Sequence, residues 1–222
     1  MNSPEPDGLS GRLREVISVE VESWLDLPML SGISAGTLDP ALFRNYLEQD
    51  YLYLRHYARL YSWLAATAPD DQLEYYVSLA HGVIAVELDH HKRAAVPFGC
   101  DFSAIVPSVE TQEYLSFYDS LAPTPAELVV AMTPCIFGYG IALDELRLHA
   151  SGLYRDWIDI YTGADYAELV ARHFQMVDGA VLAEDRALEI TARALELERR
   201  FWNQVPAAPG ASSNPITASV EA

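Results

Sequence analysis

Residues 40–67 have the sequence PALFRNYLEQDYLYLRHYARLYSWLAAT, and this stretch decides the fold class. Its apolar and aromatic side chains recur every three to four residues, which is the period of an α-helix with one buried face. Asp39 stands where a helix cap belongs, and Pro40 takes the first helical position, where a missing N–H group costs no hydrogen bond. The stretch therefore predicts a long amphipathic helix from Pro40 to about Thr67.

The same period extends through most of the chain. No segment alternates apolar and polar residues between hairpin turn signals, as half-buried strands do. The sequence therefore predicts an all-α helical bundle in a single domain. Helices are expected over Ser10–Asp26, Pro40–Thr67, Asp70 or Asp71 to Ala95, Val109–Leu121, Pro125–Ser151, Tyr154–Tyr161, Asp165–Gly179 and Glu184–Gln204.

Local signals set several of these helix ends. Residues 31–40, SGISAGTLDP, are expected to form a loop. Thr124–Glu127 has the pattern of a capping box, and Gly152 stands where a C-terminal cap belongs. The helix between them carries the longest apolar run, Leu128–Leu143, which is shorter than the roughly 20 residues that cross a bilayer. We expect this run to be a buried helix.

Composition limits the class of protein. Half of the 222 residues are hydrophobic, so a substantial core can form without disulfides or a metal. The 32 acidic and 14 basic residues give a net charge of -18, which disfavours nucleic acid and anionic membranes as partners. Two cysteines are too few for a disulfide framework, and the N-terminus lacks the pattern of a signal peptide, which indicates a cytoplasmic protein.

The two ends of the chain differ from its middle. The tail, residues 206–222, is rich in Pro, Ala and Ser and lacks aromatic residues, so it cannot bury enough surface to offset its ordering entropy. We expect residues 1–8 and 206–222 to be disordered. The folded domain is then residues 9–205.

Three polar residues fall on apolar helix faces: Asp50, Cys135 and Glu198. A buried carboxylate needs a hydrogen-bond partner, a shared proton or a polar ligand. Taken singly, each carboxylate is explained by a buried tyrosine hydroxyl, and the cysteine by an inert place in the core. Pro134 either relieves a packing conflict or kinks the helix immediately before Cys135. Together, the three residues favour a functional site.

Tyrosine outnumbers phenylalanine 13 to 7, and several tyrosines lie along one helix. Such a cluster suits an aromatic pocket for a planar heterocycle, or simply the edge of an amphipathic helix. The cluster consists of Tyr46, Tyr51, Tyr53, Tyr57 and Tyr61.

Five segments in this order resemble the TenA/thiaminase II family, helical proteins with the haem-oxygenase-like fold. They are YLEQDYLYLRHYARL (46–60), ELDHH (87–91), MTPCIFGYG (132–140), WIDIY (157–161) and ERRFW (198–202). The resemblance covers roughly residues 10–205. It implies an aminopyrimidine aminohydrolase of thiamin salvage, which converts 4-amino-5-aminomethyl-2-methylpyrimidine into the hydroxymethyl product and ammonia. Thiaminase II activity is implied as a lesser reaction.

The resemblance also implies roles for individual residues. Cys135 is the expected nucleophile, Glu198 the acid that protonates the departing amine, and Tyr53 the residue that activates the cysteine. A raised pKa, which burial gives a glutamic acid, suits the acid's role near neutral pH. No metal and no organic cofactor is expected, and family members are usually homotetramers.

Substrate binding is expected from a second set of residues. By resemblance, Asp50 binds the ring nitrogen and the exocyclic amine, while Tyr139 and Tyr161 contact the substrate. Tyr114 is the expected further pocket aromatic, although Tyr118 also suits the loosely aligned segment TQEYLSFY.

Two other functions remain open from the sequence. A di-iron oxidase on the same fold needs inward acid-and-histidine pairs, for which Glu87 with His90 or His91, and Glu145 with His149, have suitable spacing. Against it, the helix from Asp165 lacks such a pair, and Glu87 and His91 are equally explained by a structural hydrogen bond. A non-catalytic pyrimidine-binding regulatory homologue is disfavoured because it needs neither Cys135 nor Glu198.

Overall fold

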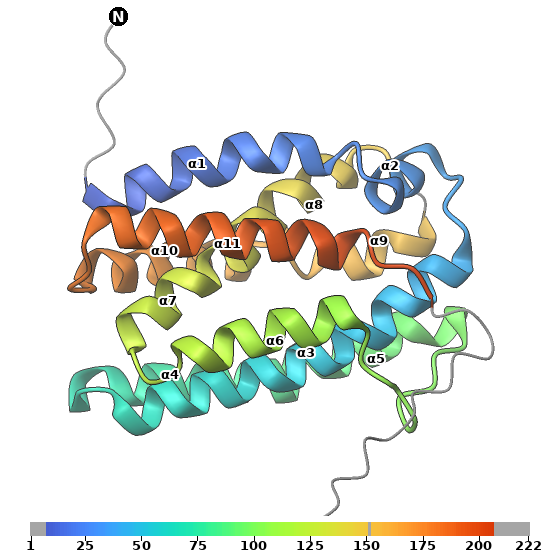
Figure 1. Ribbon diagram of the computed structural model, residues 1–222. Helices are drawn as coiled ribbons and strands as arrows, with labels where there is room; N and C mark the ends of the chain where they lie inside the picture. Colours follow the sequence, from blue (N-terminus) through green and yellow to red (C-terminus); the bar gives the residue numbers. More distant parts are fainter. Residues whose placement is uncertain (1–7, 151, 207–222) are drawn as a thin grey trace, which may run out of the picture.

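The computed structural model describes residues 8–150 and 152–206, and within these ranges it contains helices and no strand. The prediction of an all-α fold is confirmed. The elements labelled in Figure 1 are α1 (Gly8–Trp24), α2 (Pro28–Ala35), α3 (Pro40–Thr67), α4 (Asp70–Gly82), α5 (Leu88–Ala95), α6 (Val109–Leu121), α7 (Pro125–Thr133), α8 (Tyr139–Arg147), α9 (Gly152–Asp159), α10 (Ala164–Gly179) and α11 (Glu184–Trp202). Three short segments join them: the π-helices η1 (Val83–Glu87) and η3 (Pro134–Gly138), and the 3₁₀-helix η2 (Val96–Phe98).

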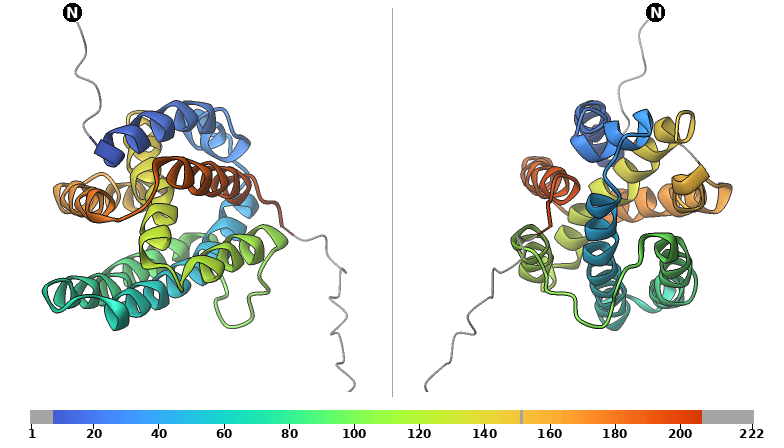
Figure 2. Two further views of the ribbon diagram at one scale, coloured as in Figure 1. Left: turned by 60° about the vertical axis from the view of Figure 1, so that its left-hand side comes forward. Right: turned by 90° about the vertical axis from the view of Figure 1, so that its right-hand side faces the viewer.

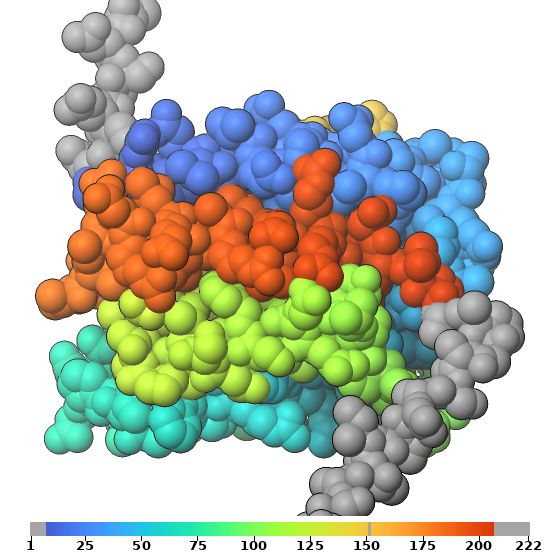
Figure 3. All heavy atoms as spheres, in the orientation of Figure 1, coloured from blue at the N-terminus to red at the C-terminus, as the bar shows by residue number. Residues whose placement is uncertain are grey.

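The helices are stacked in layers, and one continuous helical stretch crosses all of them. Helices α3 and α4 pack together on one side, α1 covers the opposite side, and α11 packs on α1, α6 and α7 between them. The continuous stretch α7–η3–α8 runs across these layers, as the left view of Figure 2 shows. In Figure 3 the side chains of α1, α11, α6–α7 and α4 form adjoining bands that close this face of the molecule.

Helix α3 forms as its sequence predicts. The Asp39 side chain accepts a hydrogen bond of 2.8 Å from the Ala41 N–H and so caps the helix at Pro40. The aromatic face is buried, and Tyr46 stacks on Trp202 of α11 with ring centroids 5.3 Å apart. Each such fully buried aromatic side chain contributes about 1.5–3 kcal/mol of apolar burial. Asp50 lies on this same face, 3 % exposed.

The helix expected over Pro125–Ser151 is interrupted and shorter. Its first part, α7, passes into the π-helical turn η3 at Pro134, because proline has no N–H to continue the α-helical ladder. Its last part, α8, ends at Arg147, where the turn tightens and the Ala150 N–H bonds to Leu146 O. Gly152 therefore begins α9 and does not cap the preceding helix.

A close crossing holds η3 from behind. A Cβ atom on Gly138 would lie 2.8 Å from the Trp24 ring of α1, which leaves room only for glycine. The stretch Pro125–Arg147 is long and apolar enough to span a membrane, but 67 % of its most apolar window is buried inside the fold. Buried core helices pass the same test, and the expectation of a buried helix holds.

Three further expectations were wrong. The first helix ends at Trp24 rather than Asp26, and part of the expected loop 31–40 belongs to α2, which begins at Pro28 and ends before Gly36 at φ 68°. The capping box at Thr124 does not form, because its side chain makes no capping hydrogen bond and Glu127 pairs with Arg186 at 2.9 Å instead. The expected disordered ends, apart from Gly8 and Pro206, lie outside the described residues.

Candidate active site

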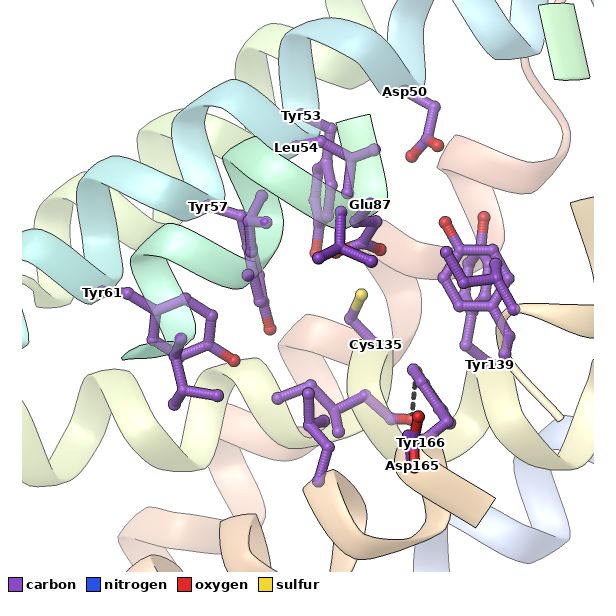
Figure 4. Close-up of a pocket in the computed structure, with 18 of the residues that line it drawn as sticks. Asp50, Tyr53, Leu54, Tyr57, Tyr61, Glu87, Cys135, Tyr139, Asp165 and Tyr166 are labelled. Carbon is purple, nitrogen blue, oxygen red and sulfur yellow. Dashed lines mark hydrogen bonds between the residues drawn. The ribbon is translucent and has the colours of Figure 1, made fainter. Parts of the chain in front are cut away.

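A cavity of about 360 Å³ lies between α3, α4, η1, η3 and α10. It brings together five of the residues expected in a site: Asp50, Tyr53, Cys135, Tyr139 and Tyr161. Figure 4 shows the Cys135 sulfur pointing into this space. The rest of the lining consists of Leu54, Tyr57, Tyr61, Ser78, Leu79, Gly82, Val83, Val86, Glu87, Ile136, Ile160, Asp165, Tyr166 and Leu169.

Both π-helical turns of the described chain face the cavity. The turn η3 presents Cys135, and η1 ends at Glu87. A π turn inserts one residue into an α-helix and re-aims the side chains that follow, and such turns recur at functional sites. The interruption that Pro134 was expected to cause therefore lies at the candidate nucleophile.

The freed carbonyls around η3 are satisfied by side chains. The Tyr166 hydroxyl donates to Ile136 O at 2.7 Å, and the Tyr57 hydroxyl donates to Met132 O at 3.1 Å. One turn earlier, Nε2 of the buried His173 lies 3.1 Å from Val129 O. These contacts fix the backbone that carries Cys135. The sequence analysis placed Tyr57 only in the tyrosine cluster and assigned no role to Tyr166 or His173.

Cys135 is a free thiol among acidic and phenolic groups. Burial, and next the nearby Glu198, raise the pKa of the Cys135 thiol well above its usual range, while a hydrogen bond with Tyr53 lowers it. None of the described lining residues is Lys, Arg or His. The resting thiol is therefore protonated, and its activation requires a group that accepts the proton.

Asp50 has a partner that the sequence analysis weighed only as an iron ligand or as a partner of Glu87. His91 of α5 lies with Nδ1 3.3 Å from Asp50 Oδ2 and Nε2 2.8 Å from Leu47 O. Burial lowers the pKa of His91, but Asp50 outweighs it and the pKa is raised. Because both ring nitrogens face acceptors and the pKa of His91 is raised, the structure favours the protonated ring, which can donate to both Asp50 and Leu47 O.

Glu198 lies behind the cavity rather than in its lining. Only 1 % of this residue is exposed, and Oε2 accepts a hydrogen bond of 2.6 Å from the Tyr114 hydroxyl. Burial raises the pKa of Glu198 to about 8, although the Tyr114 hydrogen bond opposes the rise. Tyr114 and Tyr118 also lie outside the lining, and Tyr118 shares a hydrogen bond of 2.9 Å with Tyr53.

Glu87 is a cavity carboxyl that the sequence analysis considered only as an iron ligand or as a hydrogen-bond partner of His91. Burial, and next the charge of Asp50, raise the pKa of Glu87 to about 7, while a hydrogen bond from Tyr161 lowers it. No ion pair within the described ranges involves Glu87. The i, i+4 spacing of Glu87 and His91 suggested a mutual hydrogen bond, but His91 faces Asp50 and Leu47 instead.

The residues considered as iron ligands in the di-iron alternative do not converge. Glu145 and His149 are exposed on or just beyond α8, and His173 is buried against Thr133. Within residues 8–150 and 152–206, no group of three or more His, Cys, Asp or Glu side chains is arranged to hold a metal ion. The di-iron alternative therefore lacks its ligand set in this part of the chain.

The fold places the chain among the haem-oxygenase-like helical proteins. It matches a TenA homologue from P. horikoshii OT3 with a TM-score of 0.81 at 21 % identity, over 88 % of this chain and 96 % of the other. A domain with a heme oxygenase-like fold from Shewanella denitrificans OS217 matches with a TM-score of 0.70 at 16 % identity, over 86 % of this chain and 89 % of that domain. Both identities are low, so these likenesses concern the fold.

Within this class the sequence is more specific. Residues 28–207 match the TENA/THI-4/PQQC family, and the chain belongs to that family. It is 30 % identical over 197 residues to the aminopyrimidine aminohydrolase of Halalkalibacterium halodurans, a match that spans 82 % of this chain and 88 % of the relative. The predicted family and its haem-oxygenase-like fold are confirmed.

Proposed function

We propose that the chain is an aminopyrimidine aminohydrolase of thiamin salvage. Its substrate is 4-amino-5-aminomethyl-2-methylpyrimidine, and its products are the hydroxymethyl pyrimidine and ammonia. The observation that carries the proposal is that Cys135 and Asp50 face one cavity between the same helices. Kinship with a relative named for this activity supports it. Thiamin, with the same pyrimidine, is a second substrate, and the active form is a homotetramer.

The cavity suits a small aromatic amine. Its walls combine tyrosine rings with the carboxyls of Asp50, Glu87 and Asp165, and no described lining residue is cationic. Such a lining favours a planar, positively charged ligand and disfavours an anionic one. Asp50 accepts hydrogen bonds from the protonated ring nitrogen and the exocyclic amine.

Two residues carry the chemistry. The sulfur of Cys135 adds to the pyrimidine ring, and the displaced electron pair moves to the ring nitrogen that Asp50 holds. The C–N bond of the aminomethyl group then breaks, and the departing amine takes a proton that originates from Glu198. Water adds its hydroxyl at the freed carbon, and the proton that it loses returns to the Cys135 sulfur as the bond between sulfur and ring breaks.

The direct test measures ammonia release from the aminomethyl pyrimidine, with thiamin as comparison. Chelator-treated wild-type protein is assayed beside Cys135→Ala and Glu198→Gln. Metal-independent turnover that both substitutions abolish supports the proposal. Folded wild-type protein that releases no ammonia rules out this substrate, and turnover that survives in Cys135→Ala rules out the nucleophile.

A further inference from the structure

The separation of Glu198 from the cavity raises the question of how its proton reaches the reacting atoms. Cys135 faces the cavity, whereas Glu198 is 1 % exposed and lies outside the lining. Between them lie three tyrosine side chains from two helices, Tyr53 of α3 and Tyr114 and Tyr118 of α6. The chemistry proposed for Cys135 and Glu198 gives these three hydroxyls no shared function.

The three hydroxyls lie in series from Glu198 towards Cys135. Tyr114 donates to Glu198 Oε2 at 2.6 Å, and its ring stacks on the ring of Tyr118. Tyr118 and Tyr53 share a hydrogen bond of 2.9 Å between their hydroxyl oxygens. At the other end, Tyr53 and Cys135 line the same cavity, and hydrogen bonding with Tyr53 lowers the pKa of the Cys135 thiol. Hydrogen bonding with Tyr114 likewise lowers the pKa of Tyr118.

The three tyrosine side chains are closed to solvent and packed against one another. Tyr114 and Tyr118 have no exposed surface, and Tyr53 is 3 % exposed. The rings of Tyr114 and Tyr118 stack with centroids 4.9 Å apart and an interplanar angle of 26°. Burial raises the pKa of each of the three phenols well above the usual range, so none of them holds a negative charge by itself.

We propose that Tyr53, Tyr118 and Tyr114 form a proton relay that connects the Cys135 thiol to Glu198. This inference rests on the function proposed above and assigns the route of its proton. Tyr53 contacts the reacting thiol, while Tyr118 and Tyr114 act through it.

In the outward step, four successive proton transfers carry the equivalent of one proton from Cys135 to Glu198. As the Cys135 sulfur bonds to the ring carbon, its S–H bond breaks and the proton passes to Tyr53. Tyr53 passes its own proton to Tyr118, Tyr118 to Tyr114, and Tyr114 to the Glu198 carboxylate. Each tyrosine gains and loses one proton and stays neutral, Glu198 becomes neutral, and the electron pair displaced from the ring rests on the ring nitrogen.

The return step supplies the departing amine. Glu198 gives its proton back to Tyr114, the relay runs in reverse, and Tyr53 delivers a proton at the cavity to the amine nitrogen as its C–N bond breaks. The raised pKa of Glu198, about 8, suits both directions, because the carboxylate that accepts the proton and the acid that returns it are both populated near pH 7.5. A carboxyl outside the cavity thereby serves a reaction inside it.

The test removes one hydroxyl from the middle of the relay with Tyr118→Phe. Tyr46→Phe is the matched control, because Tyr46 is equally buried and its hydroxyl has no hydrogen-bond partner in the described structure. The first readout needs no substrate: iodoacetamide alkylation of Cys135 at pH 7.5, followed by peptide mass spectrometry so that Cys100 is not counted. We expect Tyr118→Phe to slow alkylation at least about tenfold and the control to leave it unchanged.

A double-mutant cycle distinguishes a relay from a packing effect. If Tyr118 and Glu198 act in one series, Tyr118→Phe combined with Glu198→Gln slows alkylation no more than either substitution alone. Additive losses, or a Tyr118→Phe protein that alkylates like the wild type, overturn the relay. Tyr114→Phe provides a second cut with the same expected outcome.

Turnover separates this inference from the proposed function. With the aminomethyl pyrimidine, Tyr118→Phe is expected to lower kcat by about tenfold to a hundredfold with little change in KM, and to change the solvent deuterium isotope effect on kcat. If the protein is active but Tyr118→Phe changes neither kcat nor the isotope effect, the relay is contradicted. A wild type without turnover but with the expected alkylation results leaves the relay in place and removes only the substrate.

Discussion

Cys135 lies between two walls that differ in what they face. The cavity wall, formed by Asp50, Glu87 and Tyr161, borders open space that a ligand can enter. The tyrosine wall, formed by Tyr114, Tyr118 and Glu198, is packed without space for a ligand, and its polar atoms bond to one another. Both walls contain a glutamate whose pKa burial raises, to about 7 for Glu87 and about 8 for Glu198.

This difference shows that an inward-facing polar residue does not necessarily bind a ligand. Burial gives Glu87 and Glu198 similar electrostatics, and only the geometry around each shows which one a substrate can touch. We expect a carboxyl outside the cavity lining, such as Glu198, to act through neighbouring side chains. A carboxyl in the lining, such as Glu87, is expected to act on the ligand directly. The comparison therefore predicts different consequences for matched substitutions in the two walls.

The largest effect is expected where the two walls meet. Cys135→Ala removes the proposed nucleophile, which both walls would serve, so kcat for ammonia release should fall by more than about 10³-fold. Cys100→Ala is the control, because Cys100 lies at Arg44 O outside the cavity. A Cys135→Ala protein with a tenth or more of wild-type activity would mean that the walls do not serve this thiol.

Matched glutamate substitutions compare the two walls directly. Glu198→Gln should lower kcat by about a hundredfold, because it removes the end of the proton route. Glu87→Gln should lower kcat by less than about tenfold and act mainly on KM, because Glu87 faces the cationic ligand. The steady-state constants of both variants decide this, and the reverse order of kcat losses would show that the cavity carboxyl is the acid.

The cavity wall is tested alone by His91→Asn. Without the His91 ring, Asp50 loses its neighbouring partner and is positioned less firmly for the proposed contact with the ring nitrogen, so KM should rise about tenfold, which corresponds to about 1.4 kcal/mol. His81→Asn on α4, which is exposed outside the lining, should leave KM unchanged. An unchanged KM in His91→Asn would place the pyrimidine away from Asp50.

Sequence periodicity worked best along the long regular helices, whichever wall they contribute to. The long regular pattern of α3 placed Asp50 and Tyr53 inward, and the regular face of α11 did the same for Glu198. Simple 3.6-residue spacing fails at η1, because an inserted π-turn residue rotates every later side chain. Glu87 ends this turn and His91 follows it, so the pairing that their i, i+4 spacing suggests does not form.

Length and cavity shape set the other limits of prediction. Helix α2 spans only eight residues, too few for a periodic pattern to stand out from the surrounding glycines and serines. No sequence pattern distinguishes Glu198 behind a tyrosine layer from Glu198 in the lining, because both positions are buried on the same helix face. That distinction depends on side chains from α6, whose alignment left Tyr114 and Tyr118 as alternatives.

The smallest expected effect is on stability and separates the tyrosine wall from the protein surface. Glu198 has a pKa near 8 in the fold but an ordinary value near 4.5 when unfolded, so the folded state binds more protons between these pH values. The free energy of unfolding therefore falls as pH rises through this window, in part because Glu198 must ionise in the core. Glu198→Gln removes this contribution and should gain about 1–2 kcal/mol relative to wild type between pH 6 and pH 8.

Urea unfolding of both proteins across this pH range measures the effect. Glu196→Gln, two positions earlier and exposed on the same helix, should follow the wild-type curve because it removes a charge from the surface. A Glu198→Gln curve that also stays parallel to wild type would mean that Glu198 titrates as a solvated carboxyl. Glu198 would then have to contact water through the tyrosine wall. The two walls would differ only in how deep their carboxyls lie below the surface.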